Sequence, residues 1–139
     1  IWTTTPWTLP LNRAVLVKPN TDYAILAINH RLVMVGAALA DNLCNTLGVE
    51  KNIVATINAN DLVAYNAYAH HPFVSDLQVP ILADNSVITD EGTAFVHSAP
   101  GVGPEDYEIG VRNKLEIFSP ISADGKYTQG INPIELVGM

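Results

Sequence analysis

Short apolar runs separated by turn residues predict β-strands along the first third of the chain. Residues 13–18, 23–28 and 32–35 are rich in branched apolar side chains, and turn-forming residues lie between them at 19–22 and 29–31. Connections this short join antiparallel neighbours, so the pattern predicts a meander. Further strands are predicted at residues 1–5, 53–57, 81–83, 87–89 and 93–98, and a loop between Pro72 and Pro80.

Two segments show a helical period instead. The first covers residues 37–47 and is followed by Gly48, a residue type that commonly ends helices. Its predicted inward face consists of Leu39, Leu43, Cys44 and Leu47. The second begins at Pro104, with acidic residues in its first turns and basic residues in its last, as the helix dipole favours. Its predicted inward stripe consists of Tyr107, Val111 and Leu115. A shorter helical turn is expected after Asn60.

Together these elements predict a mixed α/β domain rich in antiparallel strands, a partly closed β-barrel with the two main helices at its rim. The chain has 139 residues, of which 48% are hydrophobic, and this suits one core better than two. We therefore expect residues 1–139 to form a single domain. Because the chain opens on Ile1 in a predicted strand and stops at Met139 in an apolar run, we interpret it as excised from a larger protein.

The charge balance narrows the choice of partners. Seven Lys and Arg against 14 Asp and Glu give a net charge of −7, so the domain is not a self-sufficient binder of nucleic acid or of anionic membranes. The longest apolar stretch, Leu32–Ala40, is far shorter than the ~18 residues of a membrane-spanning helix. The single cysteine, Cys44, makes no internal disulfide, and this fits a reducing intracellular compartment.

Two distant segments carry the candidate chemistry. Residues 2–12 hold four threonines and an asparagine around Pro6, a dense set of neutral donors and acceptors suited to a hydroxyl-rich or carbonyl-bearing ligand. Residues 92–107 form a strand, a Gly/Pro loop and a helix start, and the strand's alternation aligns Thr93, Phe95 and His97. His97 and Asp106 can then face a common cavity. The structural alternatives are β-branched threonines in a strand and an acidic residue in a first helical turn.

Two other chemistries have weaker support. Ser98, His97 and Asp106 have the composition of a serine hydrolase, but neighbours in a strand point to opposite faces. A metal site from His70, His71 and His97 stays open, although these residues lack the i, i+4 spacing of helical ligand pairs.

Both segments closely resemble the signature motifs of the editing domain of isoleucyl-tRNA synthetases. The opening Thr4-Thr5-Pro6-Trp7 differs from the Thr-Thr-Arg-Pro of related valyl and leucyl enzymes, and these lack the run Val96–Pro100. The resemblance implies a class I synthetase editing-domain fold, inserted in the catalytic domain of an ATP-dependent isoleucine-tRNA ligase in the cytoplasm. The implied activity is hydrolysis of Val-tRNA(Ile), with valyl-adenylate as a second possible substrate, by attack of water on the aminoacyl ester without a metal, a cofactor or a covalent nucleophile. The implied partners are the valine-charged 3′ end of tRNA(Ile) and the catalytic domain of the same synthetase.

The resemblance also implies residue roles. The pocket for the mischarged aminoacyl end contains Thr3, Thr4, Thr5 and Asn12. Thr4 and Thr5 orient the ester and the water, and Trp7 forms an aromatic wall of the pocket. His97 excludes isoleucine and Asp106 holds the α-ammonium of valine. Two positions depart from the family pattern, Ala94 where Gly-Thr-Gly is usual and Val102 where Gly-His-Gly is usual.

Physical reasoning supports such a second pocket. One methylene is worth only about 1–3 kcal/mol in an apolar pocket, a general limit for which isoleucyl-tRNA synthetase is the familiar example. A smaller site that excludes the larger side chain by a clash discriminates more steeply. The aminoacyl ester is already activated, so a positioned water is sufficient. The alternative is a catalytically silent insertion that only binds or positions the tRNA acceptor end.

Overall fold

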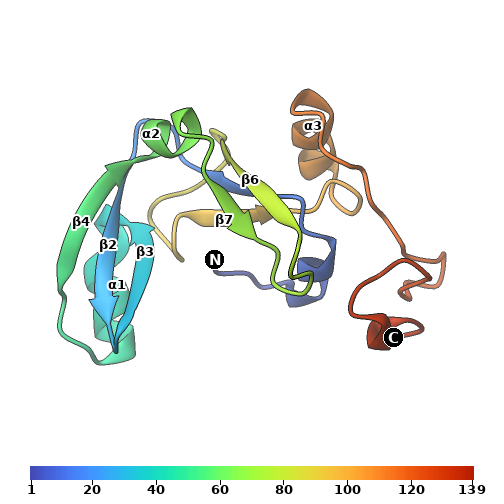
Figure 1. Cartoon of the computed structure of the whole chain (residues 1–139), viewed down its shortest axis with the longest axis horizontal. Coiled ribbons are helices and arrows are strands. Elements are labelled where there is room, and N and C mark those ends of the chain that lie inside the picture. The colour runs from blue at the N-terminus through green and yellow to red at the C-terminus, as the bar shows by residue number, and fades with distance from the viewer. The chain divides into compact units, whose positions relative to one another are not determined.

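Figure 1 shows the computed structural model of the chain, which describes residues 1–139. The residues divide into two compact units, each assembled from separate stretches. The first unit comprises residues 1–3, 16–67 and 81–96. The second comprises residues 4–15, 68–80 and 97–139. No helix is long and apolar enough to cross a membrane.

A three-stranded antiparallel sheet in the order β3-β2-β4 forms the framework of the first unit. Its strands are β2 (Asp22–Ile28), β3 (Arg31–Gly36) and β4 (Ile53–Asn58). The predicted hairpin between β2 and β3 is confirmed, and Asn29 and His30 turn it with positive φ angles. The predicted three-strand meander is wrong, because β4 and not the preceding strand pairs with the second edge of β2.

The first predicted helix is confirmed, in two parts. A single 3-10 turn, η2 (Ala37–Leu39), leads into α1 (Ala40–Leu47), and Gly48 ends it at a φ of 66°. Cys44 lies in the core as predicted, whereas Leu47 is 52% exposed because it lies in the last turn. A short helix, α2 (Ala59–Ala64), begins after Asn58, whose side chain accepts a hydrogen bond from the amide of Asn60.

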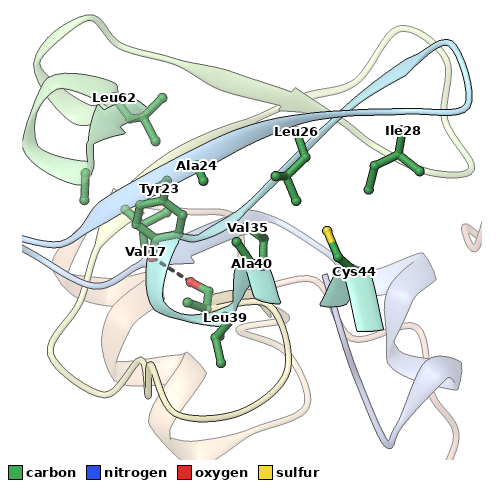
Figure 2. Packing of buried hydrophobic residues seen from close by; sticks show 12 residues of the cluster. Val17, Tyr23, Ala24, Leu26, Ile28, Val35, Leu39, Ala40, Cys44 and Leu62 are labelled. Carbon is green, nitrogen blue, oxygen red and sulfur yellow. Dashed lines mark hydrogen bonds between the residues drawn. The ribbon is translucent and has the colours of Figure 1, made fainter. Parts of the chain in front are cut away.

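The core of the first unit forms around Tyr23 (Figure 2). Its ring is fully buried and packs at 4.6 Å against the ring of Phe95. Its hydroxyl accepts a hydrogen bond from the amide of Lys18 at 3.0 Å and donates one to the carbonyl of Ala94 at 2.7 Å. The buried phenol is therefore paired on both sides, and burial raises its pKa.

A four-stranded sheet has the order β5-β6-β1-β7. Its strands are β1 (Ala14–Val17), β5 (Tyr68–His70), β6 (Gln78–Ala83) and β7 (Phe95–Ser98). The predicted loop between Pro72 and Pro80 ends early, because Pro80 lies inside β6 opposite Tyr68. The strand predicted at residues 87–89 does not form. The mixed α/β class is confirmed. Neither sheet closes into the expected barrel, since each keeps two unpaired edges.

The second unit opens with a 3-10 helix rather than the strand predicted at residues 1–5. This helix, η1 (Pro6–Leu11), starts at Pro6, whose fixed φ suits the first helical position. It leads into a small apolar core of Leu11, Ala99 and Ile131. A turn at residues 122–126 is closed by the bridge between Ile121 and Tyr127, and a 3-10 turn, η3 (Ile134–Leu136), follows.

The second predicted helix, α3 (Pro104–Arg112), is confirmed with Pro104 at its start and Arg112 in its last turn. The predicted inward stripe is wrong. Tyr107 and Val111 are 51% and 56% exposed, and the face that packs inward carries Ile109 and Gly110. Periodicity placed the wrong face inward because Gly110 allows a close approach to Pro100, within 2.6 Å of where a Cβ would lie.

Candidate functional site

A hydrogen bond joins the two segments singled out from the sequence. The Oγ1 atom of Thr8, in η1, lies 2.9 Å from Nε2 of His97, in β7, although 89 positions separate them. Next to this contact, the amide of Arg13 donates to the carbonyl of Ser98 at 2.8 Å. The site therefore lies where the end of β7 contacts η1 and the residue that follows Asn12.

The same hydrogen bonds assign the proton on His97. The hydroxyl of Thr8 has one proton and donates it to the carbonyl of Thr5 at 2.8 Å. It must then accept from His97, so Nε2 carries the hydrogen and Nδ1 is left as a bare acceptor. Nδ1 is fully covered and has no hydrogen-bond partner. Burial lowers the pKa of His97, and this effect is larger than the opposing effect of the Asp106 carboxylate. The ring is therefore neutral near pH 7.

Asp106 lies at the third position of α3 and fastens the loop before the helix. Its Oδ2 atom accepts a hydrogen bond from the amide of Ala99 at 2.9 Å. The charge of the carboxylate favours a higher pKa for His97, against the larger effect of burial. The structural role predicted for a first-turn carboxylate is thus real, and Oδ1 remains as an acceptor that a cationic ligand group can use.

Asn12 is buried and serves its own backbone. Only 3% of the residue is exposed, and its side-chain amide donates to the carbonyl of Ala14 at 2.8 Å. The guanidinium of Arg13 donates to the carbonyl of Asn12 and to Glu116, both at 2.8 Å, and stacks 4.4 Å above the ring of Phe118. Asn12 and Arg13 thereby fix the course of the chain between η1 and β1.

The other predicted residues of the opening segment lie nearer the surface. Thr4 and Thr5 are exposed, and Thr5 is the residue before η1 whose carbonyl receives the Thr8 hydroxyl. Trp7 is 61% exposed, and its carbonyl accepts a hydrogen bond from the hydroxyl of Tyr127. Thr3 belongs to the first unit. The second unit therefore contains Thr4, Thr5, Trp7, Asn12, His97 and Asp106.

Comparison with solved structures gives two informative matches. The crystal structure of GlLeuRS-CP1 matches with a TM-score of 0.69 at 25% identity, covering 81% of this chain and 44% of the other. The editing domain of the P. knowlesi cytosolic leucyl-tRNA synthetase matches with a TM-score of 0.63 at 13% identity, covering 81% of this chain and 50% of the other. The chain has the fold of a class I synthetase editing domain. It spans about half the length of these two chains. No protein-family model matches it.

Within this editing-domain fold, Thr8 is the site residue that sequence reasoning left without a role. Thr8 is one of the four threonines in residues 2–12, and its pairing with His97 does not follow from the sequence pattern. A signal was present: η1 begins at Pro6, and a hydroxyl three residues after Thr5 suits a return to that residue's carbonyl. The contact with β7 is long-range and follows from the fold.

The two departures from the isoleucyl pattern lie in different settings of the editing-domain fold. Ala94 is buried and holds a positive φ of 57°, a conformation that glycine adopts without cost. Val102 is 37% exposed, between two glycines. Gly101 has no room for a side chain, since a Cβ there would lie 1.9 Å from the carbonyl oxygen of Phe118.

The alternative chemistries gain nothing from the geometry. Ser98 is fully buried and its hydroxyl has no partner, so it does not pair with His97 as a hydrolase serine would. Among the histidines weighed as metal ligands, His71 uses Nδ1 for two backbone amides and His97 uses Nε2 for Thr8. No group of three or more His, Cys, Asp or Glu side chains is arranged to hold a metal ion.

Proposed function

We propose that this chain is an editing module that hydrolyses mischarged Val-tRNA(Ile) as part of an isoleucyl-tRNA synthetase. The observation that carries the proposal is the Thr8–His97 hydrogen bond of 2.9 Å, with Asp106 bonded to the Ala99 amide just after β7, in a chain that has the editing-domain fold. The sequence motifs at Thr4-Thr5-Pro6-Trp7 and Val96–Pro100 favour the isoleucyl type over the leucyl type of the two matched structures.

In this proposal the residues divide the work between holding the ester and limiting its side chain. Asp106 binds the α-ammonium of valine through the oxygen that Ala99 leaves available. Thr4 and Thr5, both exposed, orient the ester carbonyl and the water, while Trp7 forms a wall. Asn12 supports the pocket by holding the backbone, since its side-chain amide donates to the carbonyl of Ala14.

A site that excludes a larger substrate side chain needs a rigid side chain at the point of contact. The free-energy cost of a clash with one extra methylene is high only if the clashing side chain cannot turn aside. The bond to Thr8 and the burial of Nδ1 hold the His97 ring in one orientation. Because Nδ1 is covered, His97 acts here through its shape, and we assign it no proton transfer.

The remaining parts of the proposal concern the surroundings of the module. At a net charge of −7, the chain grips only the tRNA 3′ end, and the catalytic domain of the same synthetase supplies the basic surface for the rest. The module acts in the cytoplasm, and it needs no cofactor of its own because the ester is already activated.

Deacylation of a panel of aminoacyl-tRNAs tests the proposal. The wild-type chain is expected to hydrolyse Val-tRNA(Ile) and to spare Ile-tRNA(Ile). His97→Ala should admit the larger side chain and raise hydrolysis of Ile-tRNA(Ile) by about tenfold or more. Wild-type selectivity in His97→Ala would remove His97 from the filter, and turnover confined to mischarged tRNA(Leu) would establish a leucyl specificity instead.

A second variant separates catalysis from mere binding. Asp106→Ala should abolish hydrolysis of the valyl ester, with folding checked by circular dichroism because the Ala99 hydrogen bond is lost as well. The silent-insertion alternative is favoured by Val102, an exposed apolar residue where the family pattern has histidine. Binding of the acceptor end without turnover by the wild-type chain would establish that alternative.

A further inference from the structure

The stretch that follows α3, residues 116–118, contacts both the helix and the loop before it. On the helix, a Cβ on Gly110 would lie 3.0 Å from Cδ1 of Ile117. On the loop, the backbone of Gly101 approaches the carbonyl of Phe118 so closely that no side chain fits between them. Residues 116–118 therefore support the whole connection from β7 into α3.

A single side chain joins this stretch to the residues that follow η1. The guanidinium of Arg13 lies 4.4 Å from the centre of the Phe118 ring, in position for a cation–π contact. It also donates hydrogen bonds of 2.8 Å to the carbonyl of Asn12 and to the carboxylate of Glu116. Only 11% of the Arg13 side chain is exposed, against 67% of the Glu116 side chain. Water therefore weakens the ion pair, whereas the ring contact is protected.

The loop is joined in turn to the carboxylate at the start of α3. The amide of Val102 donates to the carbonyl of Ala99 at 3.0 Å, and the amide of Ala99 donates to Oδ2 of Asp106 at 2.9 Å. Ala99 is also buried with Leu11, the last residue of η1, in the small core against which Phe118 packs. A displacement of the Phe118 ring should therefore displace the loop and the amide that holds Asp106.

We propose that Arg13 is a positioning residue for deacylation: by stacking on Phe118 it keeps the loop before α3, and so the carboxylate of Asp106, at a fixed place relative to η1. A planar guanidinium suits this role, because it can lie on a ring and still donate to a backbone carbonyl, whereas a lysine ammonium has no flat face. This inference rests on the proposed editing function, in which Asp106 binds the α-ammonium of valine.

Four variants test the proposal by activity. Arg13→Lys keeps the charge and a donor for Glu116 but loses the flat face, Phe118→Leu removes the ring, and Phe118→Tyr keeps it. For hydrolysis of Val-tRNA(Ile), kcat should fall about tenfold in Arg13→Lys and in Phe118→Leu with little change in KM, and should stay within about threefold of wild type in Phe118→Tyr. Glu116→Gln is the matched control and should leave kcat unchanged, because the Glu116 side chain is largely exposed.

Three results would overturn the assignment. The first is full kcat in a folded Arg13→Lys, with folding checked by circular dichroism. The second is an equal loss of kcat in Glu116→Gln and Arg13→Lys, which would mean that the ion pair and not the stack is responsible. The third is an equal loss in the leucine and tyrosine variants of Phe118.

Amide hydrogen exchange tests the geometry without any turnover. The amide of Ala99 should exchange about tenfold faster in Arg13→Lys and in Phe118→Leu than in wild type and Glu116→Gln, while amides within α3 keep their protection. The double variant of Arg13 and Phe118 should exchange no faster than either single variant, because both changes remove the same contact. Unchanged exchange at Ala99 in Arg13→Lys, or additive effects, would contradict the link. If the exchange pattern is found and the wild-type chain lacks deacylase activity, the link stands and the proposed function fails.

Discussion

Thr8 shows how one hydroxyl can decide the state of a neighbouring ring. Its proton goes to the carbonyl of Thr5, and its lone pair receives the hydrogen of His97 Nε2. The orientation and the protonation of the imidazole therefore depend on a half-buried hydroxyl of a neighbouring element. The role of a site residue is set here as much by its hydrogen-bond partner as by its own chemistry.

We predict that Thr8→Val leaves the shape of η1 intact and loosens the filter. Valine has the same shape but no hydroxyl, so Nε2 of His97 loses its hydrogen-bond partner, and the free energy of unfolding should fall by about 1–3 kcal/mol. Urea denaturation measures this loss, and the ratio of Val-tRNA(Ile) to Ile-tRNA(Ile) hydrolysis should fall with it. Thr56→Val, on the exposed strand β4, is the control and should change neither quantity. An unchanged ratio in Thr8→Val would show that His97 keeps its orientation unaided.

At the scale of elements, the end of β3 and the turn before β7 fit together through two small residues. A Cβ on Gly36 would lie 2.7 Å from the Cβ of Ala94, and the amide of Gly36 donates to the carbonyl of Thr93 at 3.0 Å. Gly36 has a φ of −49°, which alanine adopts freely, so it is close approach and not backbone strain that requires glycine there.

A double-mutant cycle tests this fit. Gly36→Ala should lower the free energy of unfolding by about 1–3 kcal/mol through overpacking. In the background of Ala94→Gly, Gly36→Ala should lower the free energy of unfolding much less. Ala94→Gly itself removes about 1 kcal/mol of backbone strain, because Ala94 has a positive φ. Chemical denaturation of the four proteins gives the coupling free energy. Additive effects would mean that the two positions adjust independently.

The elements that the sequence predicted well are those governed by local patterns. Alternation located β1, β2 and β3, and helix-end chemistry located α1 and α3. Failures arose where a distant contact overrides the local preference. The β-branched residues 1–5 form no strand because no neighbouring strand pairs with them, and Tyr107 points outward because Gly110 packs on Pro100. Of the site, the residue types were predictable, whereas the Thr8–His97 and His71–loop contacts need the fold.

For the whole molecule, two buried neutral histidines make stability depend on pH. Burial lowers the pKa of both His71 and His97 in the folded chain, so the unfolded chain binds more protons near pH 6. Their stabilising contribution is complete above the ordinary histidine pKa of about 6.5 and is lost as the pH falls through their lowered values. We predict that the free energy of unfolding decreases from about pH 7.5 to about pH 5.5. Urea denaturation at several pH values measures this change, which should be much smaller in the His71→Asn, His97→Asn double variant; an equal slope would assign the dependence to other groups.

The interleaved order of the two units has a consequence for synthesis. The second unit draws on residues 4–15, 68–80 and 97–139, with stretches of the first unit between them. Thr8 is synthesised 89 positions before His97. The hydroxyl of Thr8 therefore has no imidazole to pair with until more than two thirds of the chain has been made. A nascent chain halted before β7 therefore contains all three strands of the β3-β2-β4 sheet but lacks His97, so the proposed site can form only after β7 has been synthesised.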